Sequence, residues 1–306
     1  MTILELSFTS AEHQLSVRKF SIDEAISTTF KIAIEAVSPD DDLDLEAIVG
    51  KPVMFRMVSG SAWVTSDTRV WTGVVSEMEL LRTEPGGLST YALTLEPTLW
   101  LLTQRVNNRL FQHLSVPEIA KKLLDEWKIR VDLRVDETRH PKLELRVQYA
   151  ENDYAFFCRQ LEEAGISFYF EDDGGHGSQL VLTDGPHRNE PRAGGAIRFV
   201  DDPSLARAAE HEYLTAVRVG NKVRPGRLTI RDFDFRRPGL SLHSESVVQH
   251  DVEGMLEQYH YIPGAFHHEG HQGGETPTAD DKGVARAHHT AGQRRADRRL
   301  EGHRAG

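Results

Sequence analysis

Alternating hydrophobic and polar residues in the first hundred positions predict β-strands. Residues 30–35 (FKIAIE) alternate with a period of two, which is typical of a strand with one buried face. The turn-forming residues 38–42 (SPDDD) end that strand. Residues 43–50 then predict about one helical turn before a strand at 52–58.

Two longer apolar-rich runs, residues 69–81 and 88–95, predict a β-hairpin. They flank the sequence Pro-Gly-Gly at 85–87, which favours a tight turn between two strands. Several short strands joined by turns indicate a barrel or a sandwich.

The pattern changes between about residue 100 and residue 195, where helices are expected. Ser115 and Glu118 have the spacing of a capping box, and Pro117 suits the first helical turn. Behind them, apolar side chains recur at the spacing of an amphipathic helix, at Val116, Ile119, Ala120, Leu123, Leu124 and Trp127.

A strand at 142–149 precedes a second predicted helix in this middle segment. Asn152 or Asp153 can cap that helix, which is expected to end at Gly165 before a strand at 166–170. The middle of the chain is therefore predicted to be a small α+β unit.

Strands are expected again in the last third, at residues 216–219, 227–231 and 244–249. Residues 263–281 are rich in Gly, His and Pro and predict a loop. Residues 282–304 predict a weakly amphipathic helix, and no closing strand follows before Gly306.

Composition narrows the classes of function. The 306 residues suggest two or three domains. The 36 basic and 47 acidic side chains leave a net charge of −11, which argues against binding duplex nucleic acid through a basic face. No apolar run approaches the roughly 18 residues of a membrane helix, and residues 1–10 lack the features of a cleaved secretory signal.

The search for reactive groups predicts no catalytic residue, no cofactor site and no metal site. The chain has neither a phosphate-binding glycine loop nor a serine nucleophile elbow. The single cysteine, Cys158, lies on a helix face with Phe157 and Leu161 and is interpreted as a core residue. The acidic clusters are interpreted as solvated turns; they lie at 40–44, 172–173, 201–202 and 280–281.

Histidines near the C-terminus are the one group that suggests a metal. Zinc needs three or four converging ligands, and the sequence His268-Glu-Gly-His271 lacks the i, i+4 spacing that places two imidazoles on one helix face. A solvated loop is the preferred interpretation, and a metal-dependent hydrolase is the alternative. The histidines concerned are His267, His268, His271, His288, His289 and His303.

The order of several short motifs along the chain resembles the N-terminal region of VgrG, the spike protein of type VI secretion. Each motif alone is weakly specific, whereas their collinear order is specific. The motifs are FSIDEAIS at 20–27, LDLEAIVGKP at 43–52, WTGVV at 71–75, PTLWLL at 97–102, FQ at 111–112, SVPEI at 115–119, DYAF at 153–156, LEEAGI at 161–166 and RDFDFRRP at 231–238.

The resemblance implies a β-rich α+β fold with two barrels of the tail-tube type and an inserted domain. The first barrel is expected at 1–100, the inserted α+β domain at 101–195, and an incomplete second barrel with a C-terminal loop and helix at 196–306. Relatives normally continue beyond this point into an OB-fold and a needle, so the chain is expected to be a fragment of the hub.

The resemblance also implies a structural role without enzymatic activity. Three chains would form a homotrimer that joins the hexameric Hcp tube to the threefold spike, together with baseplate proteins and a secreted effector or its adaptor. Assembly in the bacterial cytoplasm would precede export without a signal peptide, nucleic-acid binding or stable membrane insertion. A module that binds the target envelope is a further alternative.

Overall fold

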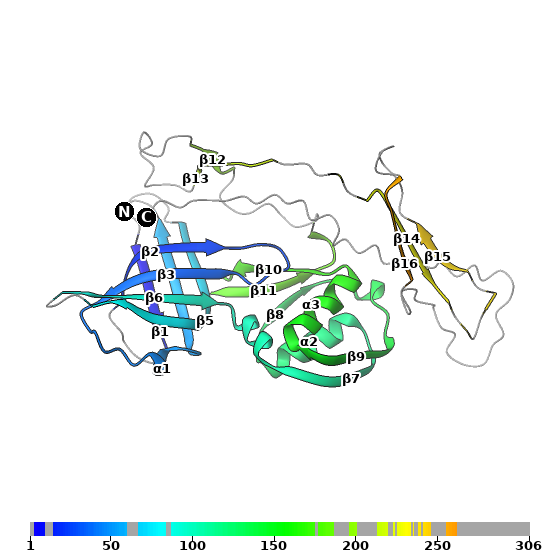
Figure 1. Cartoon of the computed structure of the whole chain (residues 1–306), viewed down its shortest axis with the longest axis horizontal. Coiled ribbons are helices and arrows are strands. Elements are labelled where there is room, and N and C mark those ends of the chain that lie inside the picture. The colour runs from blue at the N-terminus through cyan, green and yellow to red at the C-terminus, as the bar shows by residue number, and fades with distance from the viewer. Residues whose placement is uncertain are drawn as a thin grey trace. The chain divides into compact units, whose positions relative to one another are not determined.

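A computed structural model describes most of the first two thirds of the chain and short segments beyond. The described residues are 3–9, 15–59, 67–83, 87–174, 177–186, 196–200, 213–219, 223, 225–233, 235, 238–239, 241–245 and 255–261. The chain forms two compact units (Figure 1). The first contains the elements up to β13 except the last turn of α3, and the second contains β14 to β16.

A six-stranded antiparallel sheet forms the N-terminal part of the first unit. Its order is β1 (Ile3–Phe8), β4 (Pro52–Ser59), β5 (Asp67–Arg82), β6 (Ser89–Glu96), β3 (Lys31–Ser38) and β2 (Ser16–Asp23). The outermost strands β1 and β2 also contact each other, so the sheet curls as a barrel does. The predicted hairpin is confirmed as β5 and β6.

The core of this curled sheet is built from alternate residues of each strand. Ile32, Ile34 and Ala36 of β3 are fully buried, which confirms the strand predicted from the alternation at 30–35. Phe55 and Trp71 stack across neighbouring strands with ring centroids 5.8 Å apart. Burying each large apolar side chain contributes about 1.5–3 kcal/mol. The short helix α1 (Leu45–Ile48), also predicted, adds Ile48 to this core.

Strand β5 changes partner halfway along its length. Its first half pairs with β4 alone, and pairing with β6 begins at Val74, opposite Glu96. Gly73 lies at this junction. A Cβ added to Gly73 would lie 1.9 Å from the carbonyl oxygen of Glu96, so only glycine permits the approach of the two backbones.

The α+β insert follows the sheet and a 3-10 helix, η1 (Thr98–Gln104). A two-stranded ribbon of β7 (Val106–Leu114) and β9 (Leu143–Asn152) packs one face on the helices α2 (Val116–Glu126) and α3 (Asp153–Ala164). A second sheet has the order β10 (Ser167–Asp172), β11 (Ser178–Thr183) and β8 (Val131–Arg134). Between β8 and β9 lies a short 3-10 helix, η2 (Glu137–Arg139).

Local sequence signals determine the helices of the insert. The predicted capping box is confirmed, because Ser115 Oγ accepts from the amide of Glu118 and the Glu118 carboxylate accepts from the amide of Ser115. At α3, Asn152 Oδ1 accepts from the amide of Ala155. Of the two residues predicted as possible caps, Asn152 is therefore the one that caps the helix. Phe111 of β7 stacks on Phe156 of α3 with centroids 5.3 Å apart.

The β10–β11 hairpin attaches the insert to the curled sheet. Asp172 Oδ2 accepts from the amide of Val70, in the half of β5 that β6 does not pair with. Ser178 Oγ accepts from the amide of Thr72, and Thr72 Oγ1 accepts from the amide of Ser178. Asp172 is exposed at the end of β10, beside the turn in which the sequence placed it, and its carboxylate in addition accepts from a strand about a hundred residues earlier.

The described residues after the insert form short strands. In the first unit, β12 (Arg198–Phe199) pairs with β13 (Tyr213–Leu214). Residues 216–219, predicted as a strand, have no regular structure, and the strand lies just before them. The second unit contains a three-stranded sheet of β15 (Leu242–Glu245), β14 (Arg227–Asp232) and β16 (Glu257–Tyr261).

The β-rich fold class predicted from the sequence is confirmed by these sheets. The strand predicted at 227–231 is confirmed as β14, and the one predicted at 244–249 overlaps β15, although residues 246–250 lie outside the described ones. The loop at 263–281 and the helix at 282–304 also fall outside them. The three domain boundaries and the second barrel stay predictions.

Candidate functional site

The described residues include side chains that could act as metal ligands or as nucleophiles. No cluster of three His, Cys, Asp or Glu side chains that could hold a metal ion occurs among them. The C-terminal histidines of the hydrolase alternative, from His267 onward, lie outside the described part of the chain. Cys158, interpreted as a core residue, is half-buried on α3. No helix in the described segments is long and apolar enough to cross a membrane.

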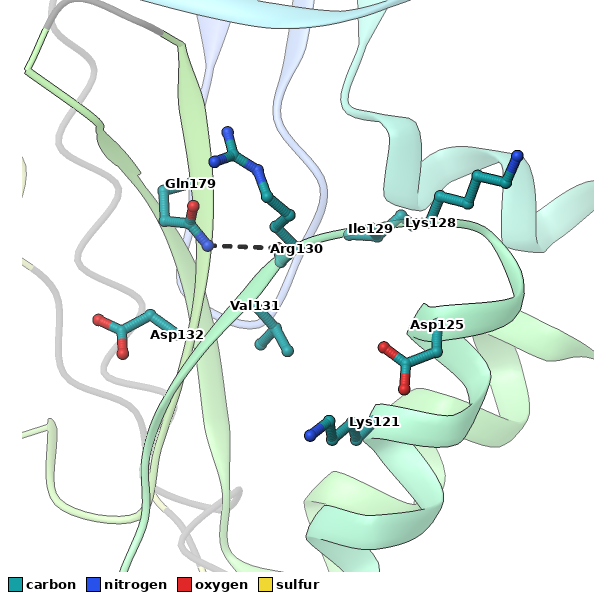
Figure 2. A pocket seen from close by; sticks show the side chains of 8 residues that line it. All are labelled: Lys121, Asp125, Lys128, Ile129, Arg130, Val131, Asp132 and Gln179. Atoms are coloured by element: carbon teal, nitrogen blue, oxygen red, sulfur yellow. Dashed lines mark hydrogen bonds between the residues drawn. The ribbon is translucent and has the colours of Figure 1, made fainter.

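An open hollow lies between the C-terminal end of α2 and the β8 strand (Figure 2). Three cationic side chains, Lys121, Lys128 and Arg130, line it together with the carboxylates of Asp125 and Asp132. Gln179 of β11 spans one side, where its Nε2 donates to the carbonyl oxygen of Arg130 at 3.2 Å. The three cationic and two anionic side chains leave one net positive charge in this lining.

The strongest polar arrangement in the insert surrounds the carboxylate of Asp153, the first residue of α3. The side chain is fully buried and accepts hydrogen bonds from Arg105 Nε at 2.6 Å, Arg109 Nη2 at 2.7 Å and Gln148 Nε2 at 2.8 Å. Both arginines also donate to Glu126, at 2.5 Å and 2.9 Å. The cluster of these five residues, here called the Asp153 clamp, ties α2 and α3 to the β7–β9 ribbon.

Charge in the Asp153 clamp is balanced by its own members. Burial acts to raise the pKa of Asp153, but the hydrogen bonds from Gln148 and Arg105 and the charge of Arg109 outweigh it, so the pKa lies below its usual value. Trp127 adds a longer contact, with Nε1 3.4 Å from Asp153 Oδ2. A carboxylate held ionised by four donors is a structural anchor, since it has no free lone pair with which to take a proton.

A second buried titratable group is His140, which lies beside Asp184. Nε2 of His140 is 3.4 Å from Asp184 Oδ2, a distance too long for a strong hydrogen bond. Burial lowers the pKa of His140, and the nearby charge of Arg139 adds to this, while Asp184 and Asp136 act to raise it. The imidazole is therefore held neutral in the folded chain.

This neutral histidine predicts a loss of stability on mild acidification. Between pH 6.5 and the lower pKa of the folded state, the unfolded chain binds a proton that the folded chain does not. The free energy of unfolding therefore decreases as the pH is lowered through this range. We expect His140→Gln to flatten the dependence measured by urea unfolding between about pH 7 and pH 5. The matched control, His113→Asn, alters an exposed histidine and should leave the slope unchanged. An equal slope in wild type and His140→Gln would contradict the assignment.

The outer face of the β7–β9 ribbon carries an unusual number of apolar side chains. Period-two alternation directs Phe111 and Arg109 toward the helices and leaves the other face to solvent. Five apolar residues of that outer face are between 40% and 78% exposed, namely Val106, Leu110, Leu145, Val147 and Tyr149. An exposed apolar surface of this kind indicates contact with another protein surface.

The curled antiparallel sheet with its α+β insert is a fold found in phage tail proteins. A solved tail protein from Neisseria meningitidis has the same fold, with a TM-score of 0.55 over 86% of this chain and 71% of that one, at 14% identity. The E. coli c3393 protein has a TM-score of 0.53 and 26% identity, covering 61% of this chain and 51% of that one. It is described as a type VI secretion component structurally similar to the T4 tail proteins gp27 and gp5.

This chain belongs to the family of the phage tail baseplate hub (GPD), whose match covers residues 23–306. It is similar to the type VI secretion spike protein VgrG4b of Pseudomonas aeruginosa, with 32% identity over 87% of this chain. The resemblance to VgrG found in the sequence is thus confirmed. The chain spans about a third of that relative, 32% of its length.

Proposed function

We propose that this chain is the hub portion of a type VI secretion spike. In this role three copies join a hexameric Hcp tube to a threefold spike, and the contacts are made by complementary surfaces rather than reactive groups. The observation that carries the proposal is the curled six-stranded antiparallel sheet, in a chain whose hub-family match covers nearly its whole length.

Symmetry gives the reason for two barrels in each chain. A first barrel within residues 1–100 and a second within 196–306 would let a trimer present six barrels to a sixfold tube, with the insert at 101–195 outside that ring. Baseplate proteins and a secreted effector or its adaptor complete the proposed set of partners. Assembly in the bacterial cytoplasm would be followed by release with the spike, and no catalytic step is assigned to the chain.

The proposal is tested by mixing the purified chain with purified Hcp hexamers. We expect a complex of three copies with one hexamer, identified from its mass by size-exclusion chromatography with light scattering. A matched sample with the chain omitted gives the mass of Hcp alone. Recovery of only the separate components, at concentrations where the chain itself is trimeric, would contradict a role as the adaptor.

A further inference from the structure

The hollow between α2 and β8 follows the edge of a sheet. Among the residues that the structure describes, β8 pairs with β11 on one side and with no strand on the other. Arg130, Val131 and Asp132 all line the hollow, although successive residues of a strand point to opposite faces of its sheet. A hollow lined by three residues in succession therefore runs along the edge of β8 rather than over one face (Figure 2). At such an edge, alternate residues direct their amides and carbonyls outward.

The size and shape of the hollow suit an extended ligand. Its volume is about 650 Å³, within the range of roughly 300–1,000 Å³ that ligand pockets occupy. The side chains of Lys121, Lys128 and Arg130 point in different directions rather than to one centre (Figure 2). Cations that do not converge fit a chain with charges spaced along it better than one compact anion.

The positive charge of this lining is available to a partner. Neither of its two lysines forms an ion pair with a described residue. The side chain of Arg130 is 83% exposed, and its ion pair with Asp173 is long, at 4.0 Å. Of the two carboxylates in the lining, that of Asp132 is already paired with Arg134 at 2.8 Å. In a chain whose net charge is −11, the hollow is thus a cationic site, complementary to an acidic partner.

The backbone at Lys128 favours a role for this cation. Helix α2 ends in a Schellman motif, in which the amide of Ile129 donates to the carbonyl oxygen of Leu124 at 2.9 Å. Lys128 occupies the position of this motif where glycine is usual, and its φ of 56° is left-handed. The chain therefore keeps a cation at the hollow at a cost in conformational strain, and such strain is retained mainly at functional positions.

We propose that the hollow binds an extended acidic segment of a partner protein, which adds to the free edge of β8 as a further strand. Main-chain hydrogen bonds to the four residues of β8 supply the affinity in this mode of recognition. The carboxylates of the segment lie beside Lys121, Lys128 and Arg130, and α2 forms the opposite wall. This contact goes beyond the adaptor role proposed above and does not depend on it.

The first test uses synthetic peptides and the full chain. The probe is a fluorescent peptide, Val-Glu-Val-Glu-Val-Glu, blocked at both ends, and its anisotropy is followed as the chain is added. We expect saturable binding that weakens as salt is raised, because the charges concerned are exposed. The matched peptide with lysine in place of glutamate should not bind. A third peptide, N-methylated at every residue, keeps the carboxylates but loses the amides, and should bind at least about tenfold more weakly.

Variants of the chain locate the binding site. Lys121→Glu reverses a charge of the lining and should weaken binding of the acidic peptide by about tenfold. Lys128→Gly removes a cation and relieves the strained backbone, so we expect it to unfold at no lower temperature than wild type while binding about threefold to fivefold more weakly. Lys51→Glu makes the same charge change at an exposed lysine outside the lining and should leave the affinity unchanged.

Hydrogen exchange read by mass spectrometry tests the strand pairing itself. The amides of residues 131–134 should exchange more slowly in the complex with the acidic peptide. An acidic peptide that fails to bind the wild-type chain overturns the inference, as it would if another segment of this chain already paired with β8. Equal binding of the lysine peptide, or an unchanged affinity in Lys121→Glu, also overturns it. Unchanged exchange in β8, or full affinity of the N-methylated peptide, refutes the strand addition.

Discussion

Replacement of Asp153 by alanine is expected to lower the free energy of unfolding by about 3–5 kcal/mol. The carboxylate is fully buried and accepts from Arg105, Arg109 and Gln148, so its removal leaves two guanidinium groups beside a cavity. Only Glu126, at the rim, would remain to balance them. Urea unfolding followed by tryptophan fluorescence measures the loss.

Two further variants make this expectation sharper. Glu126→Gln changes the partly exposed carboxylate of the same Asp153 clamp and should cost at most about 1 kcal/mol, because exposed ion pairs contribute little. Asp153→Asn keeps the size of the side chain and should lose about 1–3 kcal/mol, which provides a measurable value if the alanine variant does not fold. A loss below about 1 kcal/mol for Asp153→Ala would show that the clamp is not what holds the helices on the ribbon.

Gly73→Ala is expected to lower the free energy of unfolding by more than about 4 kcal/mol, because the added methyl group overlaps with backbone atoms. The new methyl carbon would lie 1.9 Å from the carbonyl oxygen of Glu96 and 2.7 Å from its carbonyl carbon. These are backbone atoms of β6, so relief requires β5 and β6 to separate where their pairing begins. The yield of soluble protein and the thermal unfolding temperature measure the effect.

Gly50→Ala, in the turn between α1 and β4 of the same unit, is the matched control. Gly50 has a left-handed φ of 77°, but no atom lies within 4 Å of the added carbon. Its replacement should therefore cost only the conformational strain, about 1–2 kcal/mol. If Gly73→Ala and Gly50→Ala were equally stable, the close approach of β5 and β6 at Gly73 would be refuted.

The sequence predicted those elements whose signals are local. The capping box of Ser115 and Glu118 predicted the start of α2 because both partners lie within one helical turn. Alternation predicted β3 because one of its faces is wholly apolar in the core. The signal for each of these elements lies within the element itself, so it can be recognised without knowing the rest of the fold.

Strand β7 and the Asp153 clamp show why other elements could not be predicted. The inward face of β7 holds Asn107 and Arg109 beside Phe111, so its alternation is obscured by polar residues that are paired only in the folded chain. The pairing depends on Asp153, forty-four residues away. Recognising that residues 107, 109 and 111 share a strand face would have been a signal for the strand. The contact of Asp172 with β5 is likewise non-local and left no trace in the sequence pattern.

The way the insert is attached has a consequence for attempts to shorten the protein. Along the first half of β5, the side chains of Asp172 and Ser178 accept the hydrogen bonds of backbone amides that a neighbouring strand would otherwise accept. A minimal barrel from which the insert had been excised would present β5 as a bare edge strand, with amides open to pairing with any other chain. The insert therefore protects the barrel from edge-to-edge aggregation, and the barrel and insert should be expressed and engineered as one piece.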